Sequence, residues 1–150
     1  MDIHSLTSGI TQRWYKNEKW AALLVHRALN TFAISEDIEI GVAIFRRPNT
    51  GENDPIYLGN VVTDFSDQTV NYIEGSGPPS GDWAFSGYIH THGQGSNDFS
   101  TLDWNKGRTV GMGGNVWLSS PDRQLREISY FGYTAAGSRG NWRDFIVIVH

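Results

Sequence analysis

The chain has 150 residues, of which 39% are hydrophobic and 13% aromatic, and its formal net charge is −4. This length suits a single domain over residues 1–150 with a sizeable core, and the composition is that of a globular protein rather than a disordered one. The negative charge and the lack of a Lys/Arg cluster argue against nucleic acid as the main partner. The absence of cysteine excludes disulfides and Cys-based zinc sites.

The N-terminus, Met1-Asp2-Ile3-His4, lacks the basic start and the apolar segment of a signal peptide. The longest apolar run in the first part of the chain, Trp20 to Val25, is too short to span a membrane. We therefore expect no membrane span. The protein is expected to be cytoplasmic in its producer or to be carried across a membrane by something else.

The first predicted element is a helix over residues 8–30, which Ser8 or Thr7 can cap. Apolar residues recur along it at spacings of three, four and seven and give one apolar stripe. The residues of this stripe are Ile10, Trp14, Ala21, Leu24 and Ala28. His26 also lies in this helix, where a solvent-facing or hydrogen-bonded histidine is a better expectation than a metal ligand.

A strand is predicted over residues 36–47, where aliphatic residues alternate with Glu39, Gly41, Ala43 and Phe45. Glu39 shares a face with these small and apolar residues, so we expect it to be partly buried. A buried carboxylate is costly unless it is paired or lies beside a metal. An exposed glutamate at the start of a strand is the ordinary alternative.

The remaining elements follow from alternation, turn residues and caps. They are strands at 55–65, 68–74, 83–92, 115–119, 125–133 and 142–149, a loop at 75–82 and a short helix at 100–112. A turn at Pro121-Asp122 is expected inside a hairpin. Residues 145–149 of the last strand are nearly all apolar, which favours a central place in the sheet.

The stretch from Tyr88 to Asp103 contains the pattern H-x-H, seven residues, S-x-x-D. His90 and His92 are two apart on a strand, so they project to one side and can supply two ligands to one metal. Ser100 is a good N-cap, and Asp103 in the first helical turn can complete a set of three ligands. Three protein ligands and an open position are typical of a catalytic zinc site. Each half alone also has an ordinary explanation, as a chance histidine pair and as a common helix start.

This spacing resembles the signature of the JAMM, or MPN-plus, metallopeptidases, which has an upstream Glu before H-x-H, seven residues and S-x-x-D. The resemblance implies one Zn²⁺ per chain, held by His90, His92 and Asp103, with Ser100 supporting the oxyanion. It also implies an α/β (α+β) fold of the JAMM/cytidine-deaminase-like kind, with a curved mixed β-sheet and helices packed on its faces.

The signature requires a glutamate as general base upstream of the histidines. JAMM proteins carry it at the head of a strand, followed by Gly and aliphatic residues, and Glu39 with Gly41 behind it fits this description. Glu36 is the alternative, although it lies nearer to the loop between helix and strand.

A narrower resemblance covers most of the chain. The segments that carry it are Trp20-Ala21-Ala22, Ala28-Leu29, EIGVAIFRR, GYIHTHG, FSTLD and WLSSPDRQLREI, in that order. They resemble the JAMM-like domain of unknown function at the C-terminus of bacterial RHS-type polymorphic toxins. The chain departs from that domain at two places: Val42 stands where a second Gly is expected, and Asp122-Arg123 replaces a Pro-Gly-type turn. Neither departure affects a metal ligand. This resemblance implies a toxin or effector delivered by a secretion system, with a protein or peptide substrate and a cognate immunity protein.

Together these predictions describe a zinc-dependent peptidase or isopeptidase that hydrolyses an amide bond. Three alternatives stay open. The scaffold can be a non-catalytic binding module, it can hydrolyse a non-peptide amide or a nucleobase amine, or it can be a toxin that damages its target without proteolysis. The zinc deaminases that use cysteine ligands are excluded, because the chain has no cysteine.

Overall fold

The structure, a computed structural model, describes residues 3–48, 50–51, 53–63, 81, 83–97, 115–129 and 141–145. Within these ranges the chain forms two helices and seven strands. In chain order they are α1 (Ile3–Leu6), β1 (Arg13–Tyr15), α2 (Glu18–Glu36), β2 (Ile40–Arg46), β3 (Ile56–Thr63), β4 (Ala84–Thr91), β5 (Asn115–Ser119), β6 (Leu125–Ser129) and β7 (Asn141–Phe145). The predicted strand at 68–74 and helix at 100–112 lie outside the described residues.

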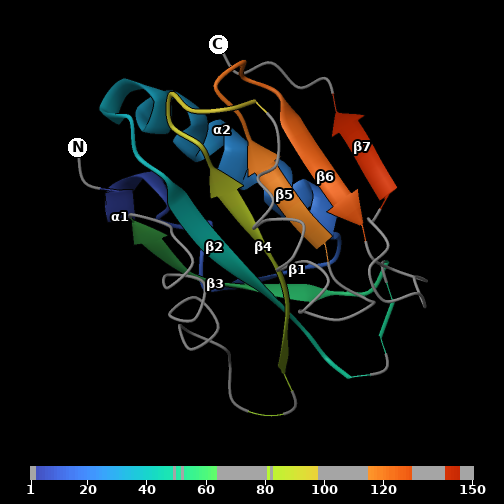
Figure 1. Cartoon of the computed structure of the whole chain (residues 1–150). Coiled ribbons are helices and arrows are strands. Elements are labelled where there is room, and N and C mark those ends of the chain that lie inside the picture. Colours follow the sequence, from blue (N-terminus) through green and yellow to red (C-terminus); the bar gives the residue numbers. More distant parts are fainter. Residues whose placement is uncertain are drawn as a thin grey trace.

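The seven strands form one sheet in the order β1-β3-β2-β4-β5-β6-β7 (Figure 1). β4 and β5 are parallel, and every other neighbouring pair is antiparallel. The sheet is therefore mixed, as predicted, and the fold is of the α+β class. β7 pairs with β6 at the end of this order. The central place predicted for residues 145–149 stays a prediction, because all of them except Phe145 lie outside the described residues.

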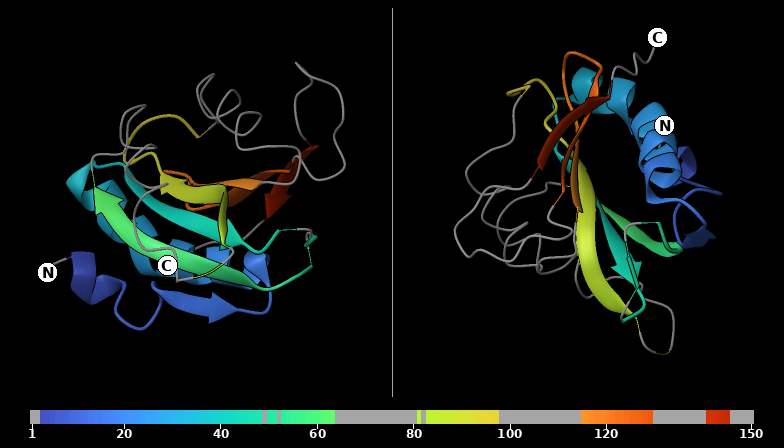
Figure 2. Two further views of the ribbon diagram at one scale, coloured as in Figure 1. Left: turned by 90° about the horizontal axis from the view of Figure 1, so that it is seen from below. Right: turned by 90° about the vertical axis from the view of Figure 1, so that its right-hand side faces the viewer.

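Helix α2 lies along one face of the sheet (Figure 2). It begins at Asn17, whose side-chain Oδ1 accepts a hydrogen bond of 3.0 Å from the Trp20 backbone N–H. It ends at Asp37, which has a left-handed φ of 51° and whose N–H points back to the carbonyls of Ala33 and Ile34. The predicted helix over 8–30 is therefore placed too early, and Asn17 is its cap instead of Ser8 or Thr7.

Strand β1 occupies part of the range predicted as helix. Its Trp14 lies opposite Tyr57 of β3, and Trp14 packs edge-to-face on Trp83 with ring centroids 4.5 Å apart. The guanidinium of Arg47 lies 5.1 Å from the Trp14 ring centroid and 5.2 Å from that of Trp83. Trp14 thus belongs to an aromatic cluster at the end of the sheet rather than to the apolar stripe of a helix, because pairing with β3 overrides the local helical spacing.

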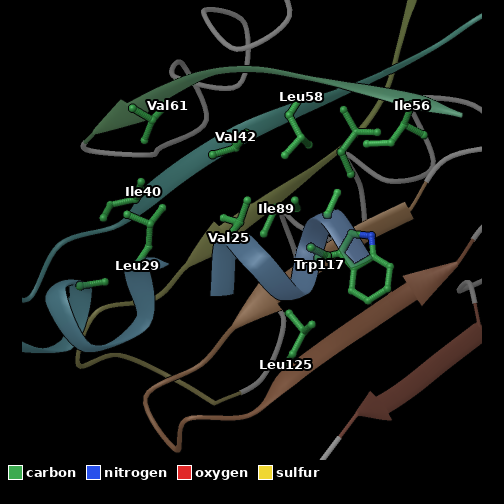
Figure 3. Close-up of a cluster of buried hydrophobic side chains, with 14 of the residues drawn as sticks. Val25, Leu29, Ile40, Val42, Ile56, Leu58, Val61, Ile89, Trp117 and Leu125 are labelled. Atoms are coloured by element: carbon green, nitrogen blue, oxygen red, sulfur yellow. The ribbon is translucent and has the colours of Figure 1, made fainter. Parts of the chain in front are cut away.

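The sheet has an apolar layer on each face. The layer under α2 joins Val25 and Leu29 of the helix to strand residues such as Val42 and Ile89, and Trp117 closes one side of it (Figure 3). The other layer is formed by Ala43, Phe45, Tyr88, Val116, Leu118 and Ile128. All seven residues of β2 are buried. Each fully buried aliphatic or aromatic side chain stabilises the fold by about 1.5–3 kcal/mol, so the buried side chains of β2, β4 and β5 hold the centre of the sheet firmly.

A buried polar network fastens α2 to the end of β5. His26 is 0% exposed; its Nδ1 lies 2.6 Å from Ser119 Oγ and its Nε2 lies 3.1 Å from the Arg123 carbonyl. Asn30 Nδ2 donates to Ser119 Oγ and to the Ser120 carbonyl, both at 2.9 Å. Of the two alternatives expected for His26, a solvent-facing or a hydrogen-bonded histidine, the structure confirms the second. The network matters for the site below, because the Trp117 carbonyl of β5 accepts a hydrogen bond from His90, one of the two histidines of the motif.

The turn between β5 and β6 contains an ion pair in which Arg126 donates to both carboxylate oxygens of Asp122, at 2.9 and 2.7 Å. These hydrogen bonds lower the pKa of Asp122 from 3.8 to about 2, against a smaller opposing effect of burial, and Ser120 Oγ also donates to the carboxylate at 2.5 Å. The predicted turn at Pro121-Asp122 is confirmed.

This pair gives the folding stability a pH dependence. A carboxylate whose pKa is lower in the folded state contributes stability that is complete above its unfolded pKa and is lost as the pH falls through the folded value. We therefore expect Asp122→Asn to lower the free energy of unfolding by about 0.5–1 kcal/mol near neutral pH. The difference should shrink as the pH falls from about 4 to about 2. Urea denaturation of both proteins along a pH series measures it, and a difference that grows on acidification would contradict the assignment.

Candidate metal centre

His90 and His92 lie at the centre of the sheet, on the face opposite α2. His90 is in β4, paired with Gly41 of β2 on one side and Leu118 of β5 on the other, and His92 directly follows the strand. The two side chains are 1% and 9% exposed. Tyr88 shares their face and its ring centroid lies 5.2 Å from that of His90. The prediction that these alternate residues point one way is confirmed.

The two imidazole rings are oriented by main-chain carbonyl groups. His90 Nδ1 lies 2.8 Å from the Trp117 carbonyl oxygen, and His92 Nδ1 lies 2.8 Å from the Ser96 carbonyl oxygen. A carbonyl oxygen only accepts, so each Nδ1 carries the proton that it donates. In a neutral ring, Nε2 then carries the lone pair. The sheet thus selects for both rings the tautomer in which Nε2 can act as a ligand.

The two Nε2 atoms approach each other to 3.0 Å. Two nitrogen lone pairs at this distance repel each other unless a cation lies between them. That cation is either a shared proton or a metal ion. Two nitrogens bound about 2.0–2.1 Å from a tetrahedral Zn²⁺ lie about 3.3 Å apart, close to the observed separation. Metal-binding histidines also usually donate their second ring N–H to a carbonyl or carboxylate. His90 and His92 therefore fit two neighbouring ligands of one Zn²⁺.

Glu39 lies one residue before β2, and it is half-buried. The predicted strand start at residue 36 is wrong, because α2 continues to Glu36 and the left-handed Asp37 turns the chain before β2 begins at Ile40. The antiparallel register pairs Gly41 with His90, so its continuation by two residues places Glu39 opposite His92. Residues directly opposite in such a pair have Cβ atoms about 4.5–5.5 Å apart on one face.

Glu36 occupies a different place from Glu39. It is the last residue of α2 and is exposed, and α2 packs on the face of the sheet that the histidines do not use. Of the two glutamates considered as the base, the register therefore brings Glu39 toward the histidine pair.

Ser100 and Asp103 lie outside the described residues, so their predicted positions stay predictions. Among the residues that the structure describes, no three His, Cys, Asp or Glu side chains gather as a metal site. Within this part of the chain the site consists of the two histidines, with Glu39 beside them by register.

The carbonyl partners of the two rings could not be found from the sequence. Trp117 and Ser96 contribute main-chain oxygens, which every residue possesses. The residue types at these two positions therefore do not indicate that they orient the histidines. Thr91, the middle residue of H-x-H, bonds the backbone on both sides of Glu39 through its hydroxyl, and the sequence pattern does not predict this role. Its position between two candidate ligands was the one available signal.

In the described ranges no helix has the length and apolar character needed to cross a membrane. The chain matched no family in a scan against models of known protein families, no protein in a search of curated proteins and no fold in a search of solved structures. The arrangement of its own residues therefore carries the functional argument.

Proposed function

We propose that the protein is a zinc-dependent peptidase or isopeptidase of the JAMM type. The observation that carries this proposal is the convergence of His90 Nε2 and His92 Nε2 at 3.0 Å, with each Nδ1 committed to a carbonyl. A histidine pair that served only to fill the core would not need both Nε2 atoms directed at one point.

The architecture supports the same proposal. A mixed sheet with β4 at its centre carries α2 on one face (Figure 1), and the layer that contains Tyr88, on the face of the histidines, lies on the other. A mixed sheet with packed helices is what the resemblance to the JAMM fold implies. The H-x-H, seven residues, S-x-x-D spacing adds Asp103 as the third ligand and Ser100 as the oxyanion donor. Together these give a set of three protein ligands, of the kind that leaves one position open for chemistry.

His90, His92 and Asp103 would hold one Zn²⁺, which when bound would lower the pKa of a coordinated water and polarise the substrate carbonyl. The remaining work falls to side chains of this protein. The Glu39 carboxylate accepts the proton of the attacking water and returns it to the leaving amine. The Ser100 hydroxyl donates a hydrogen bond to the oxygen on which negative charge develops. The Trp117 and Ser96 carbonyls keep both rings in the tautomer that the site needs.

We further propose that the protein is a bacterial toxin or effector, which is supported by the resemblance to the C-terminal domains of RHS-type toxins. Its substrate would then be a protein or peptide of the target cell, and an immunity protein would protect the producer.

Expression in the bacterial cytoplasm with and without metal-site variants tests this function. The parent protein should arrest growth and create new protein N-termini, detected by amine labelling and mass spectrometry. Treatment of the purified protein with a chelator should abolish the cleavages, and one equivalent of Zn²⁺ should restore them. Cleavage that survives removal of the metal contradicts the proposal. Growth arrest without any new N-termini would instead favour a toxin with another activity, and neither effect would favour a binding module.

A further inference from the structure

We infer that Thr91 is a positioning residue that fixes Glu39 against the histidine pair, an inference that rests on the proposed function. Thr91 stands between His90 and His92, so the alternation of β4 directs its side chain to the other face. It is 1% exposed. It therefore touches neither the substrate nor the metal, and its effect on the site must pass through the backbone.

The Thr91 hydroxyl bonds the chain on both sides of Glu39. Thr91 Oγ1 accepts the Ile40 backbone N–H at 2.9 Å and donates to the Ile38 carbonyl at 3.1 Å. One hydroxyl supplies one donor and can also accept, so a single side chain satisfies both groups. Glu39 is the residue between the two bonds, and its backbone is held at both ends.

These bonds act where the regular pairing of the strands stops. β2 begins at Ile40 and β4 ends at Thr91, and the last paired residues on this side are Gly41 and His90. Beyond this last pair, the two Thr91 bonds connect β4 to the backbone on both sides of Glu39, and so extend the cross-strand contact to the residue that the site needs.

A second set of contacts presses the loop after His92 onto the same turn. Gly93 has a φ of 59°, and a Cβ on it would lie 2.9 Å from the Ile38 backbone nitrogen and 3.0 Å from the Asp37 carbonyl carbon. Gln94 donates its backbone N–H to Asp37 Oδ1 at 2.9 Å and its side-chain amide to the Ile34 carbonyl at 3.0 Å. The turn before Glu39 and the loop after His92 are therefore packed together, and Thr91 connects them at the strand end.

A general base gains its effect from a fixed position, because misplacement by about 1 Å can cost a hundredfold in rate. The inference predicts that loss of the Thr91 hydroxyl frees Glu39 while it leaves the metal ligands in place. The resulting misplacement of Glu39 should lower kcat rather than change KM. The altered position of Glu39 should also be detectable in the structure without substrate.

The test compares Thr91→Val, which keeps the shape but lacks the hydroxyl, with Thr91→Ser, which keeps the hydroxyl. Thr50→Val serves as a matched control, since the Thr50 hydroxyl also donates to a backbone carbonyl, that of Arg47, at 2.6 Å and away from the site. Three measurements are made on each zinc-loaded protein: kcat and KM, Zn²⁺ affinity by chelator competition, and NMR. The NMR readouts are amide exchange at Ile40 and the nuclear Overhauser contact between Glu39 and the His92 ring.

For Thr91→Val we expect unchanged Zn²⁺ affinity, faster exchange at Ile40, loss of the Glu39–His92 contact and a fall in kcat of about tenfold to a hundredfold at unchanged KM. Thr91→Ser and Thr50→Val should resemble the parent. If Thr91→Val does not fold, Thr91→Ala replaces it with the same expectations. An unchanged Ile40 amide and Glu39–His92 contact in the hydroxyl-free variant would overturn the inference, and so would a loss of Zn²⁺ affinity equal to the loss of activity. A parent protein that shows the contact but cleaves nothing would refute the proposed function and leave the positioning result standing.

Discussion

Glu39→Gln is expected to bind Zn²⁺ as the parent protein does and to lose a factor of about 10²–10⁴ in turnover. Glutamine keeps the volume of the side chain and a hydrogen-bonding head, but it cannot accept a proton. Glu39 is half-buried directly before β2 and continues the register that pairs Gly41 with His90. The fold and the metal site should therefore survive, while the proton transfer should not. Turnover, Zn²⁺ affinity and the midpoint of thermal unfolding are measured on the same preparations.

Glu36→Gln is the matched control for this variant. Glu36 is the exposed last residue of α2, on the helix that covers the opposite face of the sheet, so its change should be nearly silent. If Glu36→Gln abolished activity and Glu39→Gln did not, the base would be Glu36 and the register argument would be wrong. If neither variant mattered while the histidine variants did, the metal would serve structure or a reaction that needs no carboxylate base.

The second large effect is expected from His90→Asn, which should lose Zn²⁺ binding and activity together. The asparagine amide can still donate to the Trp117 carbonyl, as His90 Nδ1 does at 2.8 Å, but it has no nitrogen in the place of Nε2. Removal of one of three ligands should cost more than the 10–100-fold in metal affinity that is typical of losing a group that only orients a ligand. Chelator competition and turnover measure both losses.

His26→Asn is the control for burial. His26 is as buried as His90, but its two ring nitrogens contact Ser119 Oγ and the Arg123 carbonyl on the α2 side of the sheet. Its replacement should lower the free energy of unfolding by about 1–3 kcal/mol, since a buried hydrogen-bonding group loses its partner. Zn²⁺ affinity should stay near that of the parent. Equal losses of Zn²⁺ in both variants would mean that His90→Asn acts by unfolding the protein rather than by removing a ligand.

The central strands could be predicted because their sequence patterns are local. The alternation in β2 and the placement of His90 and His92 on one face both follow from the period of a strand, and both are found in the structure. The start of β2 does not follow from this alternation, because Glu36 is the last residue of α2 and not part of the strand. Nothing local distinguishes a strand from the last helical turn until Asp37 adopts its left-handed conformation.

The misplaced helix had a different cause. β1 is a strand because Trp14 lies opposite Tyr57, more than forty positions further along the chain, and because it packs on Trp83. Spacing within a window of residues cannot reveal such a partner. The same limit applies to β7, whose place at the end of the sheet order is set by its pairing with β6.

For the candidate site, the sequence could supply the ligand residues but not their orientation. Both Nδ1 atoms donate to carbonyl groups only because β5 and the loop after His92 lie beside the two rings. The role inferred for Thr91 depends on the register of β2 against β4. Both features result from the way in which distant segments pack and pair, and this cannot be predicted from the residue type at any one position.

The central claim is that His90 and His92 bind a metal through Nε2, and a titration with Zn²⁺ observed at the imidazole nitrogens tests it most directly. In ¹⁵N spectra of the metal-free protein, one equivalent of Zn²⁺ should shift both Nε2 resonances to values typical of metal-bound nitrogen. The Nδ1 resonances of both rings should remain those of protonated nitrogens that donate to the Trp117 and Ser96 carbonyls. The His26 resonances should not move. Elemental analysis of protein purified without added metal should find one zinc per chain, whereas a zinc-free protein whose His90 and His92 resonances ignore added Zn²⁺ would contradict the assignment.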